Sequence, residues 1–119
     1  MTRITFYKSG DVFYGYEESG HSGFAEEGED IVCAAISAMT MLVINAIEVV
    51  YASGVDYTID DKSAKVFLIA RGALPAFEKD AKKQFAVAGL IKAFYLQLLD
   101  LAEEYYDYLS VDVVEKACK

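Results

Sequence analysis

The sequence has few of the residues on which extracellular scaffolds depend, with two cysteines, one histidine and one proline among 119 residues. Two cysteines as far apart as Cys33 and Cys118 do not form the framework of a disulfide-stabilised scaffold. The amino terminus does not resemble a secretion signal. We therefore expect the protein in a reducing compartment, the cytoplasm.

Basic residues are also scarce. The chain has 11 Lys and Arg against 19 Asp and Glu, which gives a net charge of -8. A surface of this sign repels phosphate backbones and anionic membranes and attracts basic proteins. The composition therefore argues against direct binding of nucleic acid or membranes and favours a basic protein partner.

The length fits a single domain over residues 1–119, because an apolar content of 55% is enough to form a core. Between Ile31 and Ala52 the only charged residue is Glu48, and about 20 apolar residues can span a bilayer. Polar residues interrupt this run and no Lys or Arg flanks it, so we expect a soluble helix. A helix that is apolar nearly all round needs cover on two sides, from a sheet and from a second helix or another subunit.

Two pairs of strands are predicted on either side of this helix. Residues 3–8 and 11–18 are rich in aromatic and β-branched side chains and are joined by Ser, Gly and Asp, which is the composition of a hairpin. Residues 55–60 alternate apolar and polar side chains and lead through a short polar turn into residues 64–70. This pattern predicts a second hairpin.

The helix boundaries are predicted from capping residues. Asp30 is the expected N-cap of a first helix that begins at Ile31. The second helix is expected to begin at Pro75, because proline favours the first helical position, and to continue through residues 76–106. Residues 109–115 alternate imperfectly and are a possible last strand.

The predicted fold is α+β with two layers, in the order ββαββα with a possible final strand. Two long helices pack on a largely antiparallel sheet of four or five strands.

The histidine and one of the cysteines flank a glycine-rich loop. A cysteine in the first turn of a helix feels the positive end of the helix dipole, which lowers the thiol pKa. Cys33 has that position if the helix begins at Ile31, and the loop is short enough for His21 to return to it. The backbone N–H groups of Val32 and Cys33 would then face the oxyanion of a tetrahedral intermediate. The spacing fits a Cys–His dyad for acyl transfer.

Other interpretations stay open at this point. A cysteine in an Ala-rich helix is often a small buried apolar residue, and a loop histidine is often solvated. A zinc site built from His21, Cys33, Cys118 and a carboxylate lacks any local pair of ligands, so we expect no metal or other cofactor. Cys118 lies near the chain end, where we expect an inert thiol. The loop has no Lys or Arg, which argues against a phosphate site.

The segment GHSGFAEEGEDIVCAAIS, residues 20–37, resembles the signature of the bacterial ribosomal-processing cysteine protease family Prp, in which a Gly-His-x-Gly loop leads to Val-Cys-Ala and a Ser. The resemblance implies a homodimeric endopeptidase that removes the amino-terminal extension of large-subunit ribosomal protein L twenty-seven, a step needed for ribosome assembly. It assigns the nucleophile to Cys33 and the general base to His21, with Asp30 and Ser37 as possible supporting residues.

The acidic loop is expected to bind the substrate through Gly20, Gly23, Glu26, Glu27, Gly28 and Glu29. Its carboxylates oppose the helix dipole and raise the cost of a thiolate. We therefore expect the free enzyme to hold a poorly activated thiol that a basic substrate activates. A non-catalytic dimeric adaptor that holds a basic ribosomal protein is the alternative.

Overall fold

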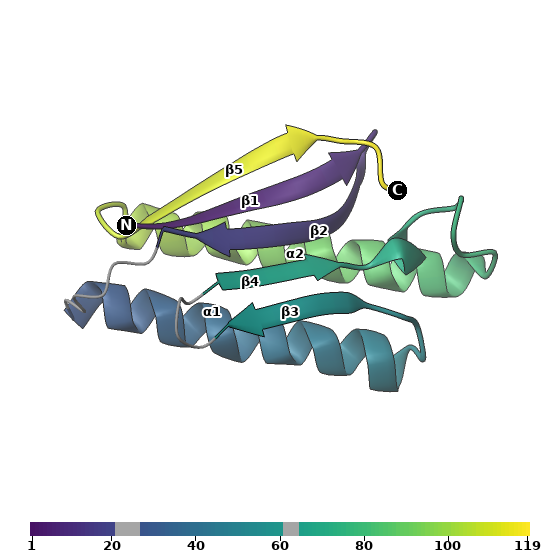
Figure 1. Cartoon of the computed structure of the whole chain (residues 1–119), viewed down its shortest axis with the longest axis horizontal. Coiled ribbons are helices and arrows are strands. Elements are labelled where there is room, and N and C mark those ends of the chain that lie inside the picture. The colour runs from purple at the N-terminus through teal and green to yellow at the C-terminus, as the bar shows by residue number, and fades with distance from the viewer. Residues whose placement is uncertain (21–26, 61–64) are drawn as a thin grey trace.

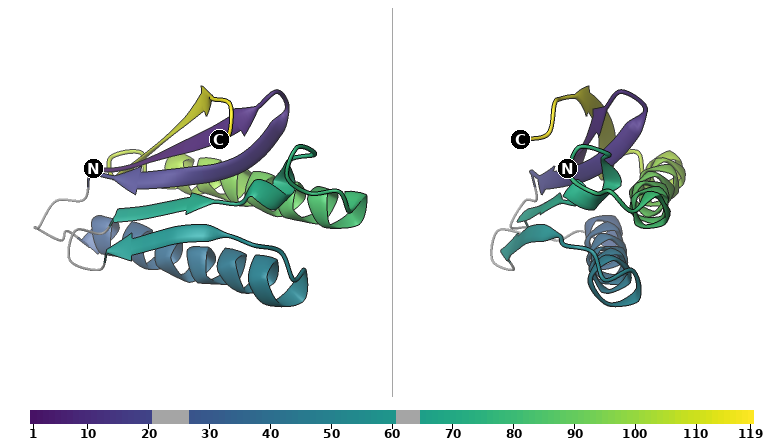
Figure 2. Two further views of the ribbon diagram at one scale, coloured as in Figure 1. Left: turned by 45° about the vertical axis from the view of Figure 1, so that its right-hand side comes forward. Right: turned by 90° about the vertical axis from the view of Figure 1, so that its right-hand side faces the viewer.

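The computed structural model of the chain describes residues 1–20, 27–60 and 65–119. Its elements, in chain order, are β1 (Thr2–Ser9), β2 (Val12–Ser19), α1 (Glu27–Asn45), the π-helical turn η1 (Ala46–Val50), β3 (Asp56–Asp60), β4 (Lys65–Ile69), the 3-10 turn η2 (Arg71–Ala73), α2 (Ala81–Glu104) and β5 (Leu109–Glu115). The strands form one sheet in the order β3-β4-β2-β1-β5. Both helices lie on the same face of this sheet (Figure 1; Figure 2, right). The predicted two-layer α+β fold is confirmed, including its final strand.

The sheet is antiparallel except at one edge. The β1–β2 hairpin turns at Gly10, whose φ of 61° lies in the left-handed region that favours glycine. The β3–β4 pair is the second predicted hairpin, and its turn lies outside the described residues. Strand β5 pairs in parallel with β1, from Thr2 opposite Leu109 to Lys8 opposite Glu115. This parallel pairing brings the segment that follows α2 beside the start of the chain.

The core lies between the sheet and the helices. Helix α2 buries a stripe at helical spacing, formed by Val87, Ile91, Phe94 and Leu98. The ring of Phe94 packs edge-on against Phe6 of β1 and Tyr16 of β2, with centroid distances of 5.9 and 4.9 Å. Aromatic pairs of this geometry add about 1 kcal/mol beyond the area they bury. The sheet and α2 therefore meet through an aromatic centre.

Helix α1 presents only one stripe to the sheet. Its buried residues, continuing into η1, are Glu29, Val32, Ile36, Thr40, Val43, Ile44 and Ile47. The hydroxyls of Thr40 and Tyr16 are 2.9 Å apart, so this polar member of the stripe is hydrogen-bonded. On the other side Leu42 is 63% exposed and Val49 is 75% exposed. Helix α2 packs beside α1 and gives it part of the expected second cover, and these exposed side chains stay uncovered by the described part of the chain.

By length and composition, Gly28–Val50 and Ala81–Glu104 could each cross a membrane. The core helix of a soluble protein passes the same test, and in this fold both helices place a buried stripe against the sheet.

Both predicted helix starts are wrong. Helix α1 begins at Glu27, so Asp30 lies inside the first turn and cannot be the N-cap. Helix α2 begins at Ala81, and Pro75 lies in the turn before it. The N-cap of α2 is Asp80, whose Oδ1 accepts from the backbone N–H groups of Lys82 and Lys83 at 2.9 and 3.4 Å. A carboxylate cap satisfies two orphan donors, whereas proline at the first position satisfies none.

The carboxyl terminus is held against the sheet and is not frayed. The Tyr14 hydroxyl donates to the carbonyl of Lys116 at 2.6 Å, and Arg71 Nε donates to the carbonyl of Lys119 at 2.9 Å. Cys118 is half-buried and packs against the core on the face opposite the helices, beside Tyr7 and Tyr14.

The cap at Asp80 generates a stability prediction. Asp80→Ala leaves two helix-terminal N–H groups without an acceptor and should lower the free energy of unfolding by about 1 kcal/mol. Asp80→Asn keeps a side-chain acceptor and should stay close to the parent. Urea unfolding followed by circular dichroism measures both, and equal losses in the two variants would contradict the assigned cap.

Candidate active site

Cys33 lies in the second turn of α1, not in the first. Its side chain is half-buried, and its Sγ lies 3.9 Å from Oγ1 of Thr2 on β1. In a helix that starts at Glu27, the N–H groups of Val32 and Cys33 belong to the interior ladder, because only the first four N–H groups lack a partner within the helix. The predicted oxyanion donors are therefore wrong, and the helix dipole acts on this thiol from one turn further away than expected.

A buried hydrogen-bonded group fixes the surroundings of the thiol. Thr2 is fully buried, and its hydroxyl donates to Oε1 of Glu29 at 2.9 Å. The same carboxylate oxygen is 3.8 Å from the amino group of Met1. A hydroxyl has one proton to donate, so Glu29 and a Cys33 thiolate compete for the proton of Thr2.

A second carboxyl group reaches the thiol from the sheet. Glu18 is opposite Ile4 in the β1–β2 register, so its side chain shares the helix-facing side of the sheet with those of Ile4 and Thr2. It is 4% exposed. Burial raises the pKa of Glu18 from 4.5 to about 7, because a low-dielectric environment disfavours the charged form.

The pKa of Cys33 is raised above its ordinary value. Burial is the largest cause, and the negative charges of Glu18, Glu29 and Asp30 act in the same direction. The hydroxyl of Thr2 acts in the opposite direction, because it can donate to a thiolate. The environment of the thiol therefore favours its protonated form, in agreement with the poorly activated thiol expected from the sequence.

The other predicted site residues fall into two groups. Asp30 and Ser37 are exposed and lie three residues before and four residues after Cys33, so α1 brings all three to one side. His21, Gly23 and Glu26 lie outside the described residues. Their arrangement relative to Cys33 therefore stays a prediction.

Three residues assigned to the loop belong to regular structure instead. Glu27 and Gly28 are the first two residues of α1, and Glu29 is 4% exposed. The assignment of Glu29 as a substrate-binding loop residue is wrong, because its carboxylate is buried and accepts the Thr2 hydroxyl. Gly20 follows β2 with a φ of 84°, and a Cβ there would lie 2.8 Å from the carbonyl of Met1.

Gly28 permits the close approach of α1 to the turn after α2. A Cβ at this position would lie 2.3 Å from Cε2 of Tyr108. The carbonyl of Tyr108 accepts the N–H of Thr2 at 2.9 Å, so the same residue contacts the start of β1. Tyr108 therefore sets the separation between the element that carries Thr2 and the element that carries Cys33.

A hollow of about 350 Å³ lies along α1, beginning one helical turn beyond Cys33. It is lined by Ser37, Thr40, Met41, Ile59 and Val66. Ser37 and Thr40 are one and two helical turns beyond Cys33 on the same side of the helix. A peptide side chain beside the thiol would find mainly apolar walls here.

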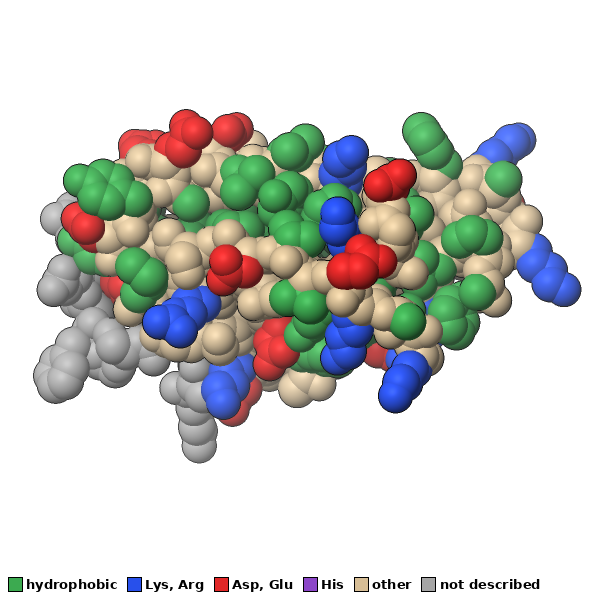
Figure 3. Space-filling view, turned by 90° about the horizontal axis from the view of Figure 1, so that it is seen from above, with side chains coloured by type: hydrophobic (Ala, Val, Ile, Leu, Met, Phe, Trp, Pro, Cys, Tyr) green, Lys and Arg blue, Asp and Glu red, His purple; other side chains and the backbone are tan. Residues whose placement is uncertain are grey.

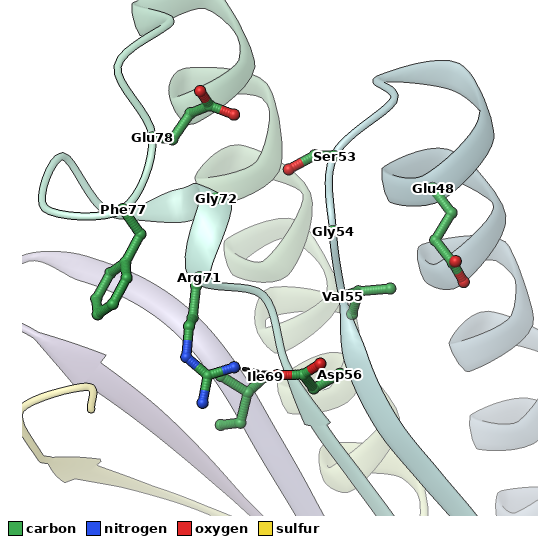
Figure 4. Close-up of a pocket in the computed structure, with 10 residues that line it drawn as sticks. All are labelled: Glu48, Ser53, Gly54, Val55, Asp56, Ile69, Arg71, Gly72, Phe77 and Glu78. Carbon is green, nitrogen blue, oxygen red and sulfur yellow. Dashed lines mark hydrogen bonds and ion pairs between the residues drawn. The ribbon is translucent and has the colours of Figure 1, made fainter.

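A cavity of about 450 Å³ lies at the opposite end of α1 (Figure 4). Glu48 of η1 lines one side and Arg71, which forms an ion pair with Asp56, lines the other. Glu48 is 15 residues after Cys33, so about 20 Å of helix separates this cavity from the thiol.

Cys33 and Cys118 also lie on different faces of the sheet, which removes the zinc alternative. Among the described residues, no three His, Cys, Asp or Glu side chains are placed to hold a metal ion.

The arrangement is a half-buried thiol on a helix, beside two buried carboxyl groups, with an open hollow further along the helix. The family model described as cysteine protease Prp matches residues 1–110. The chain belongs to the cysteine protease Prp family. The ribosomal processing cysteine protease Prp of Bacillus subtilis is 38% identical over 48 residues. This match spans 40% of the chain and 43% of the length of that relative.

Solved structures of similar proteins agree with the Prp fold. The SMU.848 protein of Streptococcus mutans is 29% identical with a TM-score of 0.78, and the alignment covers 98% of this chain and 96% of that one. The ribosomal processing protease Prp of Staphylococcus aureus, solved in complex with a substrate peptide, is 18% identical with the same TM-score. That alignment covers 96% of this chain and all of the other. At this identity the likeness shows the fold alone.

Sequence reasoning about the Prp signature missed Thr2 and Glu18. Both lie on strands and reach Cys33 only through the pairing of β1 with β2 and the packing of the sheet on α1. For Glu18 the sequence did hold a signal. Glu18 is two residues after Tyr16 on a predicted strand, so the two side chains point to the same face, and a carboxylate on the buried face of a strand is unusual.

The raised pKa of Cys33 predicts slow alkylation of the folded protein near neutral pH. A thiol with a raised pKa holds less thiolate at a given pH, so its reaction with iodoacetamide should reach half its maximal rate at a higher pH than in the unfolded chain. Cys118→Ser leaves one thiol, and the rates with and without urea can be compared directly. A lower midpoint in the folded protein would show an activated thiol instead.

Proposed function

We propose that this protein is a cysteine endopeptidase that removes the amino-terminal extension of large-subunit ribosomal protein L twenty-seven during ribosome assembly. The observation that carries the proposal is the family match over residues 1–110 together with the position of Cys33 on α1, half-buried and one helical turn before an open hollow. No other described cysteine lies beside such a hollow on the helix-bearing face, because Cys118 packs on the opposite face.

The proposed reaction is acyl transfer through Cys33. Cys33 gives its proton to His21, the thiolate forms a bond to the carbonyl carbon of the scissile peptide, and the C–N bond of the tetrahedral intermediate then breaks. His21 gives that proton to the leaving amine and afterwards takes a proton from the water that attacks the thioester. The C–S bond breaks, the acid product leaves, and His21 returns the proton to the sulfur of Cys33.

The charges of the chain suit a basic ribosomal substrate. On the face shown in Figure 3, most acidic side chains lie on the half of the molecule where α1 begins, whereas Lys and Arg are spread along the molecule and include the opposite tip. The net charge of -8 attracts a basic protein at long range. In this proposal the hollow lined by Ser37 and Met41 binds an apolar side chain of the substrate's extension. Cleavage takes place in the cytoplasm.

The dyad predicts the effect of three substitutions. Cys33→Ser and His21→Ala should each remove cleavage of the extended ribosomal protein, because one loses the nucleophile and the other the proton carrier. Cys118→Ser should cleave at the parental rate. Mass spectrometry of the products measures all three, with circular dichroism as the check on folding.

Full activity in a folded Cys33→Ser or His21→Ala variant would overturn the dyad. Binding of the extended protein without any cleavage by the parent would favour the alternative, a non-catalytic dimeric adaptor for a basic ribosomal protein.

We also propose that the active form is a homodimer. The groove between the helices is lined by Met39, Leu42, Val43, Leu90, Ala93, Phe94 and Gln97 and has a volume of about 290 Å³. Exposed apolar side chains continue beyond it at Leu96 and Val49. An apolar surface of this kind on a helix pair is suited to a two-fold interface with a second copy.

The dimer predicts a change in mass on one substitution. Leu42→Asp places a charge in the proposed interface and should shift the protein from dimer to monomer in light scattering at micromolar concentration. Tyr106→Asp places the same charge on an exposed side chain in the turn after α2 and should leave the dimer intact. A monomeric parent would refute the proposed interface.

A further inference from the structure

The buried carboxyl group of Glu18 has no role in the proposed reaction, although it lies beside the nucleophile. It is 4% exposed, and none of the hydrogen bonds and ion pairs among the described residues involves its carboxylate. A buried carboxyl group without a partner is costly when ionised, so such a group needs an explanation.

The position of Glu18 in the sheet aims it at the start of α1. The adjacent β2 residue, Glu17, is exposed on the opposite face and accepts the hydroxyl of Tyr7 at 2.7 Å. Glu18 faces the helices and is a diagonal neighbour of Thr2, whose Oγ1 lies 3.9 Å from Sγ of Cys33. Strand pairing therefore fixes this carboxyl group close to the thiol.

The described groups around Glu18 bring little compensating charge. Helix α1 contributes the carboxylates of Glu29 and Asp30 and the thiol of Cys33. Strand β1 contributes the Thr2 hydroxyl, and the amino group of Met1 is directed to Glu29. Strand β4 places apolar Val66 opposite Glu18. An ionised Glu18 raises the pKa of the Cys33 thiol and also that of the Tyr16 hydroxyl, its inward-facing neighbour on β2.

We propose that Glu18 is a positioning residue of the thiol site, whose ionised carboxylate holds Cys33 in the protonated form until that negative charge is removed. The inference rests on the proposed function only in that Cys33 is the nucleophile. The negative charges of Glu18 and of a Cys33 thiolate repel each other in this poorly solvated site, so ionisation of one group opposes ionisation of the other. The carboxyl group of Glu18 loses its proton at a lower pH than the thiol of Cys33. As the pH rises, Glu18 is therefore ionised first and opposes ionisation of the thiol.

The pKa of Glu18, raised by burial to about 7, gives this coupling physiological relevance. The charge of Glu18 therefore changes near neutral pH, and a cation brought to this carboxylate would lower the pKa of Cys33 and favour the thiolate. Reactivity of Cys33 is thereby restrained in the free protein, where stray cleavage or oxidation would be harmful.

The test compares two neutral substitutions on neighbouring positions of one strand. Glu18→Gln and Glu17→Gln, each in the Cys118→Ser background, are alkylated with iodoacetamide from about pH 6 to about pH 10. In this reaction Cys33 loses its proton to the buffer, a sulfur–carbon bond forms and iodide leaves. Glu18→Gln should lower the midpoint of the Cys33 profile and raise the rate near neutral pH by about three- to tenfold. Glu17→Gln should reproduce the parent.

A second measurement does not depend on the folding of Glu18→Gln. The coupling is reciprocal, so removal of the thiol charge by Cys33→Ser should simplify the titration of the Glu18 carboxyl carbon, followed by nuclear magnetic resonance. A single inflection should replace the two seen when the thiol is present.

Each outcome decides the proposal. An unchanged alkylation midpoint in a folded Glu18→Gln variant, or the same Glu18 titration with and without the thiol, would overturn it. Equal shifts in both Gln variants would show a general charge effect and would also overturn it. Neither measurement uses peptide cleavage, so loss of the proposed peptidase function would appear separately, as a failure to cut the extended ribosomal protein.

Discussion

The hydrogen bond from Thr2 to Glu29 is the contact on which the geometry around the thiol depends. It joins the first residue of β1 to the first turn of α1 inside the core, where neither group is exposed to water. A buried carboxylate that lost this donor would keep its desolvation cost without compensation. The contact therefore fixes how α1 meets the sheet, and Cys33, one turn further along α1, takes its position from it. Tyr108, against Gly28, closes the same corner from the segment before β5.

The burial that fixes the position of the Cys33 thiol also raises its pKa and so disfavours the reactive thiolate. A thiolate at Cys33 is disfavoured by desolvation and by the carboxylates of Glu18, Glu29 and Asp30. It is favoured only by the hydroxyl of Thr2, which already donates its proton to Glu29. The proposed nucleophile needs the thiolate, and the raised pKa of Cys33 favours the protonated thiol in the free protein. In a family of processing proteases, a low reactivity without substrate limits damage to other proteins.

Much of the fold could be predicted from residue patterns. The aromatic and β-branched runs identified both hairpins, and the imperfect alternation in residues 109–115 identified the last strand. The helix starts could not be predicted in this way. Asp30 and Pro75 are both favourable starting residues, but the structure begins α1 at Glu27 and uses Asp80 to cap α2. Capping preferences are worth about 1 kcal/mol, and tertiary contacts such as the burial of Glu29 exceed them.

The sequence by itself determined the two-layer architecture and the family, because these depend on local periodicity and on a motif contained within residues 20–37, and the same motif proposes Cys33 as the nucleophile. Only the tertiary structure decided what surrounds the thiol. Thr2 and Glu18 are 31 and 15 residues from Cys33 in the chain, and strand pairing brings them to it. The state of the thiol follows from burial and from charges that act through space, and neither quantity is encoded in the spacing of a motif.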